Sequence, residues 1–304
     1  MQNFELTILG SSSATPTSTR NPTAQLLTIA DRFCLIDCGE STQIQLRKYK
    51  IKFQRINHIF ISHLHGDHYL GLLGLLSSMH LLGRTTELHL YCPEELKEVI
   101  EVQLRVSQTY LKYTIVYHFH NYIDNELIFE DDKFTVKTIV LSHRIPCCGF
   151  IFTEKPLPGN ITKETIAYYN IPLEQIHSIK NGADFITSSG EVISNSKLVT
   201  AKPPVRSYAY CSDTAYDERI VEFIKDVTLL YHEATFMHDL LPRAIDTFHS
   251  TALQAATIAQ KAQVAQLMIG HYSARYRDLQ PLLDEAKAIF ENTVLAKEGE
   301  ITAL

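Results

Sequence analysis

Residues 62–71 read SHLHGDHYLG and place three histidines and one aspartate within six consecutive positions. His63 and His65 are two residues apart, so an extended backbone points both imidazoles to the same side. A helix beginning near His68 would use Asp67 as its N-cap, which would hold the carboxylate at the first turn. Four donors clustered in a partly buried strand–helix turn require a cation to satisfy them. The stretch therefore predicts a metal site, and its donors suit two ions better than one.

Three further strand candidates end at or near a possible ligand. His143, Asp213 and His271 fall at or close to the ends of FTVKTIVLSH, SYAYCSD and QLMIGHYS. Sheets in α/β proteins place their sites at the carboxyl ends of strands. We expect these three side chains to join the 62–71 cluster.

The remaining sequence alternates between strand-like and helix-like segments. Strands are expected at 4–10, 25–30, 32–39, 56–63, 87–92, 113–120, 134–143, 207–213, 227–234 and 266–273. Helices are expected at 68–82, 94–110, 163–170, 215–225, 250–263 and 278–291. The strand candidates are rich in Val, Ile, Tyr and Phe. This interleaving favours an α/β or mixed sandwich over an all-β protein.

Composition places the chain among ordinary globular proteins. Its 304 residues suffice for one large domain or two ordinary ones, with 45% hydrophobic and 20% charged residues. No apolar run is long enough to cross a membrane, and the start MQNFELTILGSSS lacks the basic and apolar regions of an export signal. The six cysteines form no CxxC pair, which indicates reduced core residues of a cytoplasmic protein.

Residues 154–204 interrupt this rhythm with several prolines and glycines and are expected to form an inserted flexible arm within a single domain, 1–304. Five lysines in the arm balance five acidic residues. The net charge of the whole chain is −6, which argues against a protein coated in nucleic acid but allows local phosphate binding.

Several motifs, taken in order, resemble one known family. HLHGDH (63–68) resembles the HxHxDH signature of the metallo-β-lactamase superfamily. LIDCGESTQ (35–43) resembles a segment of ribonuclease Z, the transfer-RNA 3′-processing endonuclease family. Further similar segments are SATPTSTRN (13–21), CSDT (211–214), HEATF (232–236), HST (249–251) and GHYSARY (270–276). The resemblance spans about residues 4–276, nearly the whole chain.

The resemblance implies an αββα sandwich with a dinuclear zinc site between its two sheets, and a homodimer in which the arm of one subunit serves the partner's active site. It implies that one ion is held by His63, His65 and His143 and the second by Asp67, His68 and His271, with Asp213 bridging the two. Nitrogen and oxygen ligands without a thiolate are typical of catalytic zinc or manganese.

The resemblance also implies removal of the 3′ trailer from precursor transfer RNA, leaving a 3′-OH on the transfer RNA. A two-metal centre lowers the pKa of water to about 7, and Asp67 is placed to accept the proton of the nucleophile. His249 is the candidate proton donor to the leaving ribose oxygen, oriented by Glu233. The alternatives are a helix-cap neighbour for His249 and a surface acid for Glu233.

Candidate phosphate contacts lie in or beside the same motifs: Arg20, Asn21, Ser250, Thr251 and Arg275. The run RKYKIKFQR (47–55) has five basic and no acidic residues, so it either tracks an RNA backbone or forms a solvated helix end.

Two departures from the family pattern stand out. Ser41 replaces the second glycine of the usual Gly-Glu-Gly-Thr-Gln, a mild change provided that the backbone does not need a positive φ there. In the arm, Leu173-Glu174 stands where the family has Gly-Pro, and the balanced charge predicts a weaker electrostatic grip on RNA.

Two other functions are weighed against the nuclease. A phosphodiesterase acting on small phosphodiesters is favoured by the acidic net charge and the altered arm, while HEATF and HST count against it. A binding protein with an inactive site is disfavoured, because all seven expected ligands and both further candidates are present.

Overall fold

The computed structural model describes residues 3–200 and 202–304. Met1 and Gln2 of the amino-terminal stretch, and Ala201 of the 154–204 segment, lie outside the described residues. The chain forms two compact units. The first contains the chain up to Thr153 together with Arg206–Leu304, and the second is Glu154–Val205. They are described separately.

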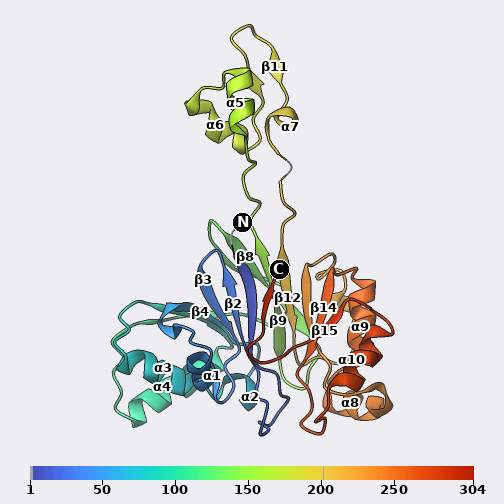
Figure 1. Cartoon of the computed structure of the whole chain (residues 1–304). Helices are drawn as coiled ribbons and strands as arrows, with labels where there is room; N and C mark the ends of the chain where they lie inside the picture. Colours follow the sequence, from blue (N-terminus) through green and yellow to red (C-terminus); the bar gives the residue numbers. More distant parts are fainter. Residues whose placement is uncertain (1–2, 201) are drawn as a thin grey trace. The chain divides into compact units, whose positions relative to one another are not determined.

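The first unit is built on two seven-stranded sheets (Figure 1). The first sheet has the order β16-β1-β2-β3-β4-β5-β6. Its strands are β1 (Phe4–Gly10), β2 (Ala24–Ile29), β3 (Arg32–Ile36), β4 (Ile56–Phe60), β5 (Leu88–Cys92), β6 (Ile115–Phe119) and β16 (Ile301–Ala303). The second has the order β15-β14-β13-β12-β9-β8-β7. Its strands are β7 (Leu127–Glu130), β8 (Phe134–Leu141), β9 (Cys147–Glu154), β12 (Ser207–Cys211), β13 (Leu229–Glu233), β14 (Gln266–Gly270) and β15 (Thr293–Leu295).

Half of each sheet is parallel. Strands β3 to β6 pair in parallel in the first sheet, and β12 to β15 do so in the second. Because parallel strands end at the same edge, the loops after β3, β4, β12, β13 and β14 are gathered at one edge of each sheet. These loops carry most of the residues that the sequence marks as functional.

Helices cover the outer faces of both sheets (Figure 1). Buried side chains of α1 (Thr42–Lys48), α3 (Leu72–Leu81) and α4 (Glu95–Val106) join one core cluster with the first sheet. Those of α9 (Ala252–Lys261) and α10 (Gln280–Lys287) join another with the second sheet. The alanines of α9 allow the helix to lie close to the strands.

The inner faces of the sheets pack against each other through large side chains. In β12, Tyr208 and Tyr210 belong to this inner core, whereas Ala209 and Cys211 belong to the outer one, as the two-residue period of a strand requires. The layers are thus helix, sheet, sheet and helix, which confirms the expected αββα sandwich. All six cysteines are buried and free, as expected.

Two sequence-based helices need correction. The expected helix 215–225 is wrong, because only a 3₁₀ turn forms at Glu218–Ile220 after the Asp217 carboxylate accepts the Arg219 N–H. The expected helix 68–82 is two helices, α2 (Gly66–Tyr69) and α3. The break falls at Gly71, where an added Cβ would lie 2.0 Å from the Gly39 carbonyl oxygen, so the helix adapts to a neighbouring loop.

Several other elements were not predicted from the sequence. Helices α1 and α8 (Leu241–Thr247) and strands β7, β9, β15 and β16 were not expected. The strands that begin at residues 56, 134, 207 and 266 end two or three residues earlier than expected. Four candidate ligands therefore lie beyond the strands, in the loops that follow them: His63, His143, Asp213 and His271. No helix within the described ranges is long and apolar enough to cross a membrane.

The second unit has its own small core. It contains α5 (Lys163–Tyr169), α6 (Leu173–Lys180), α7 (Asn195–Leu198) and the hairpin β10 (Phe185–Ile186) and β11 (Val192–Ile193). The buried side chains are Ile161, Ile171, Ile179, Phe185, Ile193 and Leu198. Thr162 caps α5 by accepting the Thr165 N–H. Tyr168 and Leu173 remain about four-fifths exposed, at 78% and 80%.

Candidate metal centre

The seven expected ligands lie in the segments that follow four strands, β4, β8, β12 and β14; two of them, Asp67 and His68, belong to helix α2. Asp213 and His271 have φ values of 60° and 56°, so the backbone leaves the extended conformation sharply after β12 and β14. Such positive values are uncommon outside glycine and are concentrated at functional sites. The turns direct both side chains toward the 63–68 segment.

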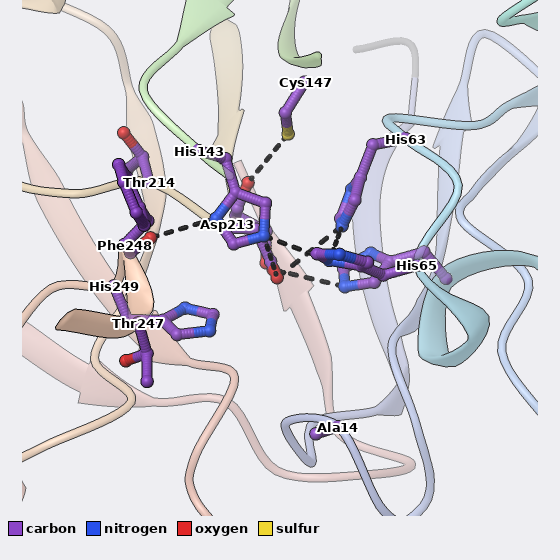
Figure 2. A network of polar contacts seen from close by, with 12 residues as sticks. Ala14, His63, His65, His143, Cys147, Asp213, Thr214, Thr247, Phe248 and His249 are labelled. Atoms are coloured by element: carbon purple, nitrogen blue, oxygen red, sulfur yellow. Dashed lines mark hydrogen bonds and ion pairs between the residues drawn. The ribbon is translucent and has the colours of Figure 1, made fainter. Parts of the chain in front are cut away.

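Asp213 lies between two groups of side chains. Its Oδ2 is 3.7 Å from Nε2 of His63 and 3.6 Å from Nε2 of His143. Nδ1 of His65 is 3.1 Å and 3.0 Å from the same two nitrogens. Figure 2 shows these three imidazoles facing the Asp213 carboxylate. These four residues form the first group whose ligand atoms converge.

The other Asp213 oxygen faces the second group. Its Oδ1 is 3.1 Å from Nε2 of both His68 and His271. Oδ2 of Asp67 is 3.5 Å and 3.4 Å from the same two nitrogens. One carboxylate therefore presents one oxygen to each group, which is the arrangement of a bridging ligand in a two-metal site.

Hydrogen bonds orient the imidazoles of the first group. Ser62 donates its hydroxyl to Asp37, so its oxygen accepts from Nδ1–H of His63 at 3.0 Å. His143 donates Nδ1–H to the Phe248 carbonyl at 3.0 Å. Both rings thus turn the unprotonated Nε2 toward Asp213, as a metal requires.

The second group is oriented in the same way. His68 donates Nδ1–H to the Asp37 carboxylate at 2.7 Å. Thr235 donates its hydroxyl to Glu233 and accepts from Nδ1–H of His271 at 3.1 Å. Both Nε2 atoms again face the centre.

The donor set fits divalent cations. Nε2 of His68 is buried without a hydrogen-bond partner in the described part of the chain, a state that a bound cation would relieve. Burial and the nearby His68 hold the pKa of His63 well below its usual value, so this imidazole is neutral and able to bind metal. Burial alone would raise the pKa of Asp213, but the surrounding imidazoles hold it well below its usual value.

Asp67 is not the N-cap that the sequence analysis expected. Helix α2 begins at Gly66, so the N-cap position belongs to His65 and Asp67 lies within the first turn. Its Oδ2 accepts the Ala14 N–H at 2.8 Å. Because the helix starts two residues earlier than expected, Asp67 is not at the N-cap, and its carboxylate faces His68 and His271.

Asp37 is a functional candidate that sequence analysis missed. It is fully buried, has a φ of 54°, and accepts hydrogen bonds from His68, Ser62 and the Tyr210 hydroxyl. It could have been found from its position directly after the buried strand β3, inside LIDCGE, because a buried carboxylate needs hydrogen-bond donors.

His249 and Glu233 form a pair beside the centre. Nδ1 of His249 is 2.8 Å from Oε1 of Glu233, and Glu233 is fully buried, which excludes the surface-acid alternative. Glu233 also accepts the backbone N–H groups of Thr214 and Ser250. Burial alone would lower the pKa of His249, but the Glu233 carboxylate raises it to about 9. Glu233 thus favours the protonated form of His249.

A cleft of about 390 Å³ opens onto these groups. Its lining includes Asp67, His143, Asp213, His249 and His271. The ring of His249 lies 5.2 Å from that of His143 and 5.4 Å from that of His271, measured between centroids. A molecule in this cleft therefore contacts the metal-binding groups and the imidazolium together.

Sequence comparison identifies relatives over the full length of the chain. Ribonuclease Z of Bacteroides fragilis strain YCH46 is 50% identical over 98% of both chains, and that of Porphyromonas gingivalis strain ATCC 33277 is 45% identical over 98% of both. The chain belongs to the ribonuclease Z family. The structure of the short form of human tRNase Z agrees, with a TM-score of 0.73, 27% identity and 98% of both chains covered.

A family model described as Anti-Pycsar protein Apyc1 matches residues 4–157. That match ends before Asp213, Glu233, His249 and His271. The match to the ribonuclease Z relatives extends over 98% of the chain and is not confined to this part.

Two of the residues expected to contact phosphate form hydrogen bonds within the protein instead. Arg20 is buried and donates to the backbone carbonyls of Tyr276 and Ser273 at 2.8 Å and 3.2 Å. Asn21 donates its backbone and side-chain N–H groups to the Glu298 carboxylate. Both residues hold the amino-terminal loop against the carboxyl-terminal part of the unit.

The remaining expected contacts lie outside the cleft lining. Ser250 donates its hydroxyl to the Thr214 carbonyl at 2.7 Å, and Thr251 forms a capping box with Gln254 at the start of α9. Arg275 is exposed, with its guanidinium 5.1 Å from the ring centre of Phe236.

Arg144, which sequence analysis missed, does line the cleft. Its side chain is exposed and makes no hydrogen bond or ion pair with any described residue. The signal was a basic residue directly after His143.

The basic run 47–55 spans the end of α1 and the following 3₁₀ turn. Arg55 lies 4.3 Å from the ring centre of Phe33 and donates to the Asp31 carbonyl. At least one cation of this run, Arg55, therefore interacts with groups of the protein itself.

Proposed function

We propose that this ribonuclease Z cleaves the 3′ trailer from precursor transfer RNA and leaves a 3′-OH on the transfer RNA. The observation that supports this most directly is that two ligand groups converge on Asp213 at one cleft, which is also lined by His249 with its hydrogen bond to Glu233. The first can hold metal ions at a phosphate, and the second can protonate a poor leaving group.

The centre would hold two divalent ions, zinc or manganese. His63, His65 and His143 would hold one ion and Asp67, His68 and His271 the other, with Asp213 presenting one carboxylate oxygen to each group. When bound, such ions lower the pKa of water to about 7 and neutralise charge on phosphate oxygens. The all-nitrogen-and-oxygen donor set supports this assignment.

Asp67 accepts the proton of the attacking water. Burial alone would raise its pKa, but His68 and His271 hold the pKa well below the usual value. The carboxylate is therefore ionised at neutral pH. It lies in the cleft lining, where a nucleophile can reach it.

His249 donates a proton to the leaving ribose oxygen. An alkoxide is a poor leaving group, so protonation as the bond to phosphorus breaks lowers the barrier. The buried Glu233 fixes the ring through Nδ1 and leaves Nε2 for the substrate. Glu233 is held in turn by two backbone N–H groups and the Thr235 hydroxyl.

The second unit, Glu154–Val205, serves as a flexible substrate-binding arm in a cytoplasmic homodimer. Its separate core supports independent positioning of the arm, and its exposed Tyr168 and Leu173 can contact unpaired or stacked bases. With five lysines balancing five acids, its contribution to RNA affinity depends only weakly on salt.

The decisive experiment incubates the metal-loaded protein with precursor transfer RNA carrying a 3′ trailer and maps the cut. The expected product ends beside the discriminator nucleotide with a 3′-OH. Absence of this cut, together with fast hydrolysis of a small phosphodiester such as bis(p-nitrophenyl) phosphate, would replace the nuclease by a small-substrate phosphodiesterase.

A further inference from the structure

A second cavity, of about 300 Å³, lies beside the metal centre. It is lined by Leu64, Pro93, Glu95, Tyr122, Ile145 and Pro146. Apart from Glu95, these side chains are apolar or aromatic, and none of the described lining residues is cationic. The proposed reaction leaves this cavity unused.

The same two loops build both cavities. In the 63–65 segment, His65 lines the metal cleft and Leu64 lines the second cavity. In the 143–146 segment, His143 and Arg144 line the cleft, whereas Ile145 and the residue after it line the cavity. Consecutive Cα atoms are about 3.8 Å apart, so residues that line the second cavity directly adjoin metal-binding residues along the chain.

Arg144 stands at the boundary of the two cavities. It lines the metal cleft and is followed by Ile145, which lines the second cavity. Since its guanidinium has no partner among the described residues, it is available to an anion. A phosphate is a strong partner for such a group.

Tyr122 supplies the aromatic wall of the cavity. Its ring packs edge-on against His120 at 5.3 Å, and His120 is fixed by a hydrogen bond to the Ile61 carbonyl at 3.1 Å. The ring is therefore held in place before any ligand arrives. Flat apolar ligands stack well on such a ring, whereas the Glu95 carboxylate at the cavity disfavours an anion.

We propose that the second cavity receives the base of a nucleotide flanking the scissile phosphate, while Arg144 contacts a phosphate of the same strand. The base stacks against Tyr122 and the apolar side chains of the two loops. Stacking of this kind binds single-stranded RNA with little regard to sequence. The inference rests on the proposed function, because it requires an RNA strand in the metal cleft.

The test uses the wild-type enzyme and precursor transfer RNAs with one abasic nucleotide. The abasic site is placed immediately upstream of the scissile bond, immediately downstream of it, or several nucleotides into the trailer as a control. We expect kcat/KM to fall about tenfold or more at one flanking position and to stay unchanged at the control position. A flat response at both flanking positions would overturn the base site.

Variants of Tyr122 then connect the loss to the cavity. In Tyr122→Leu, the ratio of kcat/KM between intact and abasic substrates should fall to about one, whereas Tyr122→Phe should keep the wild-type ratio. A merely structural role of Tyr122 would lower activity on both substrates alike and preserve the ratio, which would contradict the proposal. If the intact precursor is not cut although a small phosphodiester is, the proposed function fails instead.

Discussion

Nδ1 of His249 lies 2.8 Å from a carboxylate oxygen of Glu233, a residue that is fully buried. Three further groups, two backbone N–H groups and the Thr235 hydroxyl, hold the same carboxylate. Burial opposes a charged imidazole, but the carboxylate outweighs it and raises the pKa of His249 to about 9. The pair thus keeps a proton donor at the metal cleft.

Glu233→Gln should shift the pH dependence of RNA cleavage. His249 can donate only below its pKa, so its contribution to catalysis declines as the pH rises through that value. Without the carboxylate, burial lowers the pKa, and the alkaline limb of kcat moves to lower pH. At neutral pH we expect a loss of about 10²–10⁴-fold. Hydrolysis of bis(p-nitrophenyl) phosphate is the control, since its leaving group needs no proton; equal losses on both substrates would contradict the role of His249.

Asp37→Asn should weaken metal binding by about 10- to 100-fold, because Asp37 orients His68 and, through Ser62, also His63. Competition between the protein and a chelator of known affinity measures the effect. Asp132→Asn is a matched control, as its side chain is 67% exposed. Equal metal affinity of both variants would show that Asp37 supports only folding.

Ser41→Gly should stabilise the protein. Ser41 has a φ of 69°, and its side chain makes no capping hydrogen bond, so the change removes strain without losing a helix cap. The greater entropy of glycine in the unfolded chain opposes this gain, so the net increase in the free energy of unfolding is about 0.5–1 kcal/mol. Denaturant melts measure it. Gln103→Gly, on the exposed side of α4, should lose about 1 kcal/mol in the same assay, and a loss for Ser41→Gly would contradict the strain.

Thr251→Ala should destabilise the protein by about 1 kcal/mol through loss of the capping box of α9, measured by denaturant unfolding. Thr251→Ser retains the oxygen and should behave like wild type. Unchanged stability combined with weaker RNA binding would restore the phosphate-contact role that sequence analysis expected for Thr251.

Chelation should lower the melting temperature and abolish activity, and adding zinc or manganese should restore both. The carboxylates of Asp213 and Asp67 and the imidazoles converge, and bound cations would offset the cost of burying them together. A ligand present at 1,000 times its Kd stabilises the folded protein by about 4 kcal/mol. Thermal melting with and without chelator checks this. An Asp213→Asn variant should show little further change on chelation; a full wild-type shift would argue against Asp213 as bridging ligand.

Much of the fold was predictable because the strands carry clear local patterns. Ten strand segments were placed, and the four that precede candidate ligands were among them. The prediction of a helix at 215–225 was wrong because the Asp217 carboxylate accepts the backbone N–H of Arg219, which stabilises a tight turn instead. The terminal strand β16 escaped because only its pairing with β1 makes a strand of three residues stable.

The sequence by itself determined the identities of the candidate ligands, since clustered histidines and aspartates at strand ends have few other uses. Only the tertiary structure decided how Asp213 divides its two oxygens between His63 and His68, and that Asp67 points into the centre instead of capping a helix. It also decided that Arg20 donates hydrogen bonds to backbone carbonyl groups, whereas Arg144 lines the cleft without a hydrogen-bond partner among the described residues. The physical reason is that motif order specifies which groups exist, whereas burial and hydrogen bonding across distant loops specify which groups remain available.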